Sequence, residues 1–179
     1  MRNEFEIKVQ WIAFPLHPET PPEGRTLEEL FAGRNVNIPQ MIARLKKTAG
    51  DLGLPFGDRK KTYNSRLAQE LGKWAEKKGS GDTFHDAVFR AYFADGRNIA
   101  DKDTLADVAH SAGLNANEAR KVLADRTFKA AVDSDWSRAY ESKVTAVPTF
   151  LITGHSLVGA QSYNVLANFI QQSGTKQRV

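Results

Sequence analysis

The chain lacks cysteine, the side chain that carries out thiol chemistry in proteins. Its 179 residues include four histidines, His17, His85, His110 and His155. The nucleophile of thiol–disulfide exchange is a cysteine thiolate, so this polypeptide alone has no catalytic residue for that reaction. The histidines have no metal-ligand spacing and no cysteine partners, so we expect no metal site.

A proline near the C-terminus begins an apolar run that is typical of a strand. Residues 148–153 (Pro-Thr-Phe-Leu-Ile-Thr) predict this strand, Gly154-His155 predicts a two-residue turn, and the strand returns from Ser156 to Ala160. His155 is therefore expected to be a turn residue rather than a ligand. Without further information, a proline at this point indicates the start of an edge strand, because proline has no backbone donor.

A helix is expected to follow the hairpin. Apolar residues recur at helical spacing over residues 161–172, as Val165, Leu166, Phe169 and Ile170. At the start of this helix, near Ala160 and Gln161, backbone N–H groups have no intrahelical partner, and such an end attracts a carboxylate. Every helix has such an end, so this feature alone does not define a site.

Composition indicates a soluble globular protein of one compact unit. Apolar residues make up 41% and charged residues 26%, and no apolar run is long enough to span a bilayer. The N-terminus lacks the apolar stretch of a secretory signal, so we expect a cytoplasmic protein with no membrane partner. The net charge is +4, and the basic runs at 46–47, 59–61 and 77–78 are scattered among acidic residues. This scatter favours solvated surfaces over a nucleic-acid site.

The N-terminal part is expected to begin with a strand. Apolar and polar residues alternate from Phe5 to Trp11, which predicts a strand over residues 5–14. Four prolines between positions 15 and 22 remove backbone donors, so residues 15–24 are expected to be an extended connection. A helix in one or two pieces is expected over about 27–47, followed by a loop to Lys61.

Helical periodicity dominates the middle of the chain. Apolar residues recur at helical spacing between Asn64 and Gly79. The helices that follow can be capped by Asp82-Thr83, by Asp103 and by Asn115. A longer helix is expected over about 126–141. These apolar stripes are typical of a helical core rather than of a cofactor site.

The order of strand, helical insertion, proline, hairpin and terminal helix is that of a thioredoxin fold without its opening strand and helix. The residues that carry a more specific resemblance are FPLHP at 14–18, PPEG at 21–24, FRAYF at 89–93, VPTF at 147–150 and GAQ at 159–161. Together they resemble the DsbA-like oxidoreductases of the FrnE type, whose relatives by architecture are 2-hydroxychromene-2-carboxylate isomerases and kappa-class glutathione transferases.

The resemblance implies an α/β fold class with an incomplete thioredoxin-like fold. Its first strand and helix are absent, and it carries a large all-helical insertion. Residues 1–26 and 142–179 would form the thioredoxin-like core, and residues 27–141 the insertion. The family's active site, a Cys-x-x-Cys or a serine, lies where the first strand meets the first helix, and this sequence has no counterpart. A full-length member would have roughly 30 more residues before Phe5.

The resemblance also implies a substrate-binding site. The family's hairpin proline, which follows a cis peptide bond, corresponds to Pro148, and the exposed backbone before it corresponds to Val147. Ala160 and Gln161 correspond to the helix start that holds the anionic end of glutathione in the glutathione-binding relatives. These four are the candidate binding residues. We expect no cofactor, with glutathione as the candidate ligand.

The absent first strand would leave a gap in the middle of the sheet. Unpaired backbone groups at two inner edges would be too costly for a marginally stable domain. We expect a second copy to fill the gap, giving a homodimer. The alternative is that residues 5–14 shift and pair directly with residues 148–153.

Three functions follow from these expectations. The first is a DsbA-like family member that lacks the Cys-x-x-Cys segment and is redox-inactive as given. The second is a glutathione-binding, isomerase-like protein that uses Val147 and Pro148. The third is a non-catalytic domain that binds a peptide or partner strand at its exposed sheet edge. The absence of cysteine favours the first.

Overall fold

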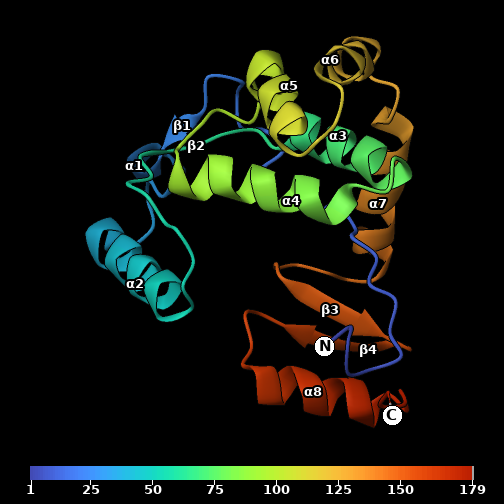
Figure 1. Ribbon diagram of the computed structural model, residues 1–179. Helices are drawn as coiled ribbons and strands as arrows, with labels where there is room; N and C mark the ends of the chain where they lie inside the picture. Colours follow the sequence, from blue (N-terminus) through green and yellow to red (C-terminus); the bar gives the residue numbers. More distant parts are fainter. Residues whose placement is uncertain (179) are drawn as a thin grey trace. The chain divides into compact units, whose positions relative to one another are not determined.

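The computed structural model describes residues 1–178 and shows an α/β chain that is mostly helical, with few short strands (Figure 1). The strands are β1 Arg25–Thr26, β2 Lys61–Thr62, β3 Thr149–Ile152 and β4 His155–Val158. The helices are α1 Leu27–Leu30, α2 Ile38–Asp51, α3 Arg66–Lys77, α4 Gly81–Phe89, α5 Lys102–Ser111, α6 Ala116–Asp125, α7 Lys129–Glu141 and α8 Tyr163–Gln172, and a π-helical segment, Arg90–Ala94, continues α4.

The chain divides into two compact units. The helical unit is residues 17–133, and the hairpin unit combines residues 1–16 with the chain from Ser134 onward. The boundary falls inside α7, so that helix belongs to both units. Among the described residues, no helix combines the length and apolar character that crossing a bilayer requires.

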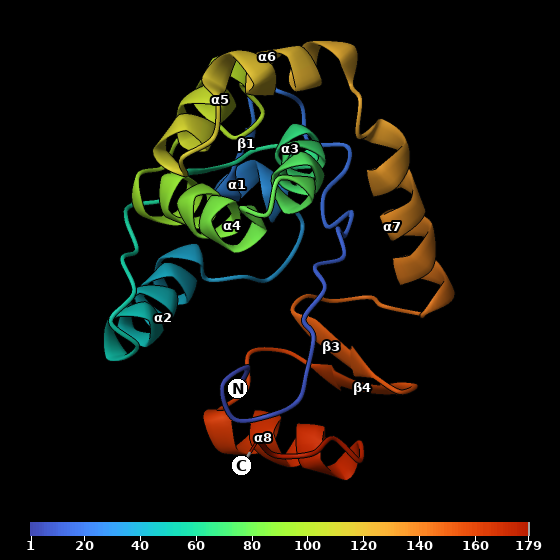
Figure 2. The same ribbon diagram turned by 45° about the vertical axis from the view of Figure 1, so that its right-hand side comes forward.

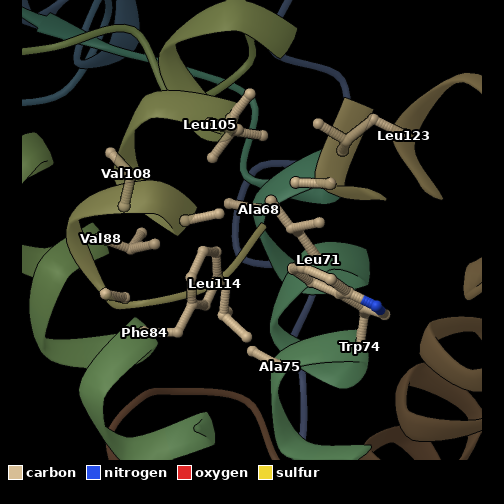
Figure 3. Packing of buried hydrophobic residues seen from close by; sticks show 14 of the residues in the cluster. Ala68, Leu71, Trp74, Ala75, Phe84, Val88, Leu105, Val108, Leu114 and Leu123 are labelled. Atoms are coloured by element: carbon tan, nitrogen blue, oxygen red, sulfur yellow. The ribbon is translucent and has the colours of Figure 1, made fainter. Parts of the chain in front are cut away.

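The helical unit has a core made by α3, α4, α5 and α6. Leu71, Phe84 and Leu105 are fully buried, and Leu123 from α6 packs into the same cluster, as Figure 3 shows. The stripe predicted between Asn64 and Gly79 is confirmed as α3. Burying such large apolar side chains is the main favourable term in folding, so this cluster is what holds the four helices together.

Of the caps predicted for α5 and α6, the structure confirms one and contradicts the other. Asn115 caps α6 as predicted, and its Oδ1 accepts hydrogen bonds from the N–H groups of Asn117 (2.9 Å) and Glu118 (3.0 Å). Capping of α5 by Asp103 was wrong, because Asp101 accepts the bond from the N–H of Thr104 (2.7 Å). Asp101 and Asp103 both precede the same apolar stripe, so spacing alone did not show which of them caps α5.

The helix predicted over 27–47 forms in two pieces, α1 and α2. Asn37 caps α2 through a hydrogen bond from the N–H of Gln40 (3.0 Å), and Pro39 lies in the first turn. A proline there removes only an N–H that has no intrahelical partner, so it begins the helix. The two-residue strands β1 and β2 pair with each other and were not predicted.

A buried carboxylate ties α3 to the end of α6. Glu70 is only 1% exposed and accepts hydrogen bonds from Nε of Arg66 (2.7 Å) and from Nε (2.7 Å) and Nη2 (2.6 Å) of Arg126. Nη2 of Arg66 also donates to Asp133 (2.5 Å). Arg126 has φ 52°, in the left-handed region, which ends α6 and turns its side chain back to Glu70.

The strand predicted over residues 5–14 was wrong. Within residues 1–178, this segment forms only a single bridge between Phe5 and Gln177, and β3 pairs with β4 rather than with it. Phe5 is buried, but Val9 and Trp11 are exposed by 45% and 40%. Alternation of apolar and polar residues shows which side chains could face a core. A strand also needs a neighbouring strand whose backbone groups complete its hydrogen bonds. The alternative pairing of residues 5–14 with 148–153 is therefore also absent from the described chain.

The predicted hairpin is confirmed, but its turn lies one residue earlier. β3 and β4 pair in antiparallel register with Ile152 opposite His155, so Thr153 and Gly154 form the turn. Their φ angles are 45° and 83°, the two positive values that a type I′ turn needs. His155 is an exposed strand residue, and its assignment to the turn was wrong.

Candidate binding site

The candidate site begins at Val147 and Pro148, which lead into β3. The peptide bond between them is cis. Val147 is 45% exposed, and among the described residues no hydrogen bond engages its N–H or its C=O. The hydroxyl of Thr149 donates to the carbonyl of Ala146 (2.6 Å), a bond that spans Val147 and Pro148. Val147 therefore presents one free backbone donor and one free acceptor.

The residues that follow β4 lie next to Pro148. The N–H of Gly159 donates to the carbonyl of Pro148 (2.8 Å), which extends the β3–β4 ladder by one pair. Ala160, which is exposed, follows immediately after this bond. The structure thus brings the start of α8 next to Val147 and Pro148.

The start of α8 leaves two backbone donors available. Ser162 caps the helix by accepting from the N–H of Val165 (3.4 Å). The side-chain amide of Gln161 donates to the carbonyl of Val158 (2.8 Å). This bond holds the link between β4 and α8. No acceptor within residues 1–178 engages the N–H groups of Tyr163 and Asn164. Free N–H groups at a helix start favour a carboxylate.

A tyrosine at the start of α8 forms a hydrogen bond with a glutamate near the N-terminus. The hydroxyl of Tyr163, the first residue of α8, donates to Glu4. This hydrogen bond raises the pKa of Tyr163 and lowers the pKa of Glu4, so the phenol stays a donor. Without a cysteine, the arrangement can bind through backbone donors and acceptors but contains no nucleophile for exchange.

The structure therefore gathers all four predicted site residues at one end of the hairpin. Val147 and Pro148 precede β3, and Ala160 and Gln161 follow β4. Their role as binding residues stays a prediction. Sequence reasoning missed the Thr149 hydroxyl bond to Ala146, for which the only signal was a hydroxyl side chain just after the proline.

Comparison with known proteins agrees with this fold. The profile of the DSBA-like thioredoxin domain matches residues 1–171, so the chain belongs to the DSBA-like thioredoxin domain family. It is 25% identical over 173 residues to the uncharacterized protein YwbO of Bacillus subtilis (strain 168), an alignment that covers 96% of this chain and 85% of YwbO.

A solved structure is also similar. The probable DsbA oxidoreductase SCO1869 from Streptomyces coelicolor matches with a TM-score of 0.81 and 28% sequence identity, over 89% of this chain and 72% of that one. These similarities confirm the DsbA-like family that the sequence motifs predicted. The finer resemblance to FrnE-type proteins stays a prediction.

Proposed function

We propose that this chain is a redox-inactive protein of the DsbA-like family that binds an extended peptide at Val147 and Pro148. The observation that carries the proposal is the free N–H and C=O of the exposed Val147, in a chain without cysteine. An extended peptide that pairs with this backbone adds main-chain hydrogen bonds to the hairpin edge. Such binding needs no thiol.

Peptide binding is tested with a cysteine-free hexapeptide of alternating valine and threonine. Titration calorimetry should show binding, and a copy N-methylated at the paired amides should bind about fivefold more weakly for each hydrogen bond lost, at about 1 kcal/mol apiece. The methylated peptide is the matched control, because its side chains are unchanged. Equal affinity for both peptides would refute pairing through the backbone.

Redox inactivity is tested separately by the reduction of insulin with dithiothreitol. The chain should leave the rate of insulin precipitation at its uncatalysed value, because it supplies no thiolate. Any concentration-dependent acceleration by the purified polypeptide would refute redox inactivity while leaving peptide binding to be judged by calorimetry.

Glutathione is the second candidate ligand, favoured by the two free N–H groups at the start of α8. These donors follow the bond between Gly159 and Pro148, so one small peptide could contact them and Val147 together. Glutathione should bind, and the analogue whose glycine carboxylate is an amide should bind more weakly, because the helix start favours an anion. Absence of heat with glutathione would rule out this candidate.

A further inference from the structure

The helix α2 has an apolar stripe that no other part of the helical unit buries. Ile38, Met41, Ile42, Leu45, Ala49 and Leu52 recur at three- and four-residue intervals along α2 and its C-terminal cap. No residue of α2 is buried, and Leu45, Leu52 and the following Leu54 are exposed by 38%, 68% and 54%. α2 lies to the side of the α3–α6 bundle in both views (Figures 1 and 2).

The same stretch of chain carries the positive charge of the protein. Residues 34–61 contain seven lysines and arginines and two aspartates, a net charge of +5, whereas the whole chain has a net charge of +4. Both aspartates already have partners, because Lys46 pairs with Asp58 and Lys47 with Asp51. The remaining cations, Arg34, Arg44, Arg59, Lys60 and Lys61, have no carboxylate at ion-pair distance within residues 1–178.

The basic residues of α2 lie beside or opposite its apolar stripe. With about 100° between successive helical residues, Arg44 and Lys46 lie on either side of the apolar stripe, and Lys47 lies opposite it. Long basic side chains beside an apolar face can extend their charged ends away while their methylene groups cover that face. This is the pattern of a helix that lies in the plane of a membrane surface.

We propose that residues 34–61, with the stripe of α2 at their centre, bind the surface of a bilayer that contains anionic lipids. A second copy is a poorer occupant, because two segments of net charge +5 would repel each other. Nucleic acid would need the charges but not the apolar stripe. The sequence predicted no membrane partner from the lack of a spanning run, and a helix in the interface needs no such run. The proposal goes beyond peptide binding at Val147 and does not depend on it.

The test is sedimentation of the full chain with vesicles of phosphatidylcholine, alone or mixed with phosphatidylglycerol. We expect binding to the mixed vesicles, weakened by added salt, and at least tenfold weaker binding to phosphatidylcholine alone. Arg44→Gln should weaken binding about fivefold, since each basic residue near an anionic surface contributes to affinity. Lys102→Gln, at an exposed position of α5 outside this segment, is the matched control and should bind as the wild type does.

The apolar part of the proposal has its own variant. Leu45→Gln combined with Leu52→Gln should weaken binding at least tenfold, because two leucines no longer enter the interface. Leu16→Gln, at a leucine that is 51% exposed outside the segment, should change nothing. Equal sedimentation with vesicles of phosphatidylcholine alone and with the mixed vesicles would overturn the proposal. Unchanged binding by the double leucine variant would overturn it too. So would sedimentation velocity without vesicles in which that variant converts a dimer to a monomer, since the stripe would then contact a second copy.

Discussion

Glu70 is a buried carboxylate of the helical unit that pairs with two guanidinium groups. Burial alone raises the pKa of Glu70, but the hydrogen bonds and charges of Arg126 and Arg66 outweigh burial and lower the pKa. The same bonds raise the pKa of Arg126. A buried charge costs several kcal/mol of solvation unless its partners compensate, so the three hydrogen bonds from Arg66 and Arg126 make this carboxylate tolerable in the core.

Glu70→Gln should destabilise the helical unit by about 3 kcal/mol at neutral pH, because two guanidinium groups lose their counter-charge. Since the pKa of Glu70 is lowered by folding, the stability that its charge provides is complete above the unfolded value of about 4.3. It is lost as the pH falls through the lower folded value. Urea unfolding should therefore show a difference between wild type and variant that shrinks below about pH 4.

The control for this measurement is Glu28→Gln, at an exposed position on α1. It should change the free energy of unfolding by no more than about 0.5 kcal/mol. A difference for Glu70→Gln that persists unchanged into strong acid would show that its cost comes from packing rather than from charge.

At the level of elements, the π-helical segment is held by a close backbone approach. The N–H of Gly57 donates to the carbonyl of Phe93 (2.8 Å), and a Cβ on Gly57 would overlap the carbonyl oxygen of Ala94. The ring of Phe56 stacks on that of Phe93, with centroids 6.0 Å apart. Glycine is therefore required at position 57 by space, not by its φ angle.

Gly57→Ala should lower the free energy of unfolding by about 1–3 kcal/mol, because the loop must move away from Ala94. The matched control is Gly50→Ala in α2, where no atom lies within 4 Å of the added carbon. There alanine should stabilise the helix by up to about 1 kcal/mol through its higher helix propensity. Equal effects of the two substitutions in thermal unfolding would contradict this account.

The hairpin turn contains a residue that is poorly suited to its backbone. Thr153 has φ 45°, a left-handed conformation that is unfavourable for a β-branched side chain. Asn-Gly is the preferred pair for this turn, so Thr153→Asn should stabilise the hairpin by about 0.5–1 kcal/mol. Slower hydrogen exchange of the backbone amides in β3 and β4 would show this stabilisation. Thr145→Asn, at an exposed site before the hairpin, should leave exchange unchanged.

Elements specified by local residues were the ones that could be predicted. The cap at Asn115 and the stripe of α3 lie within a few residues of the helices that they define. The segment from Phe5 has an equally regular pattern, but a strand depends on a partner that is distant in sequence, and periodicity carries no information about it. For the site, the motifs named four residues that lie together at one hairpin end, whereas the bond from Thr149 to Ala146 depends on a backbone geometry that no pattern specifies.

For the whole molecule, the remaining question is what pairs with the outer edges of the hairpin. β3 and β4 form a two-stranded sheet, and among the described residues neither has a second neighbour. Leu151 and Val158 are 45% and 52% exposed. A two-stranded hairpin is marginal by itself, and an edge strand with unpaired backbone groups favours association. We propose that two copies pair through β3 across a two-fold axis, since such an interface is self-complementary. A peptide bound at Val147 and Pro148 would then compete with the second copy for this edge.

This dimer predicts a mass in light scattering that falls from two chains to one on dilution. Leu151→Lys should shift the equilibrium towards the monomer, because a charge on an edge strand opposes pairing with a second strand. Val165→Lys, at a residue of α8 that is 40% exposed, adds the same charge away from the edge and should leave the mass unchanged. A monomer at every concentration would refute pairing between copies and leave the β3 edge available to a peptide.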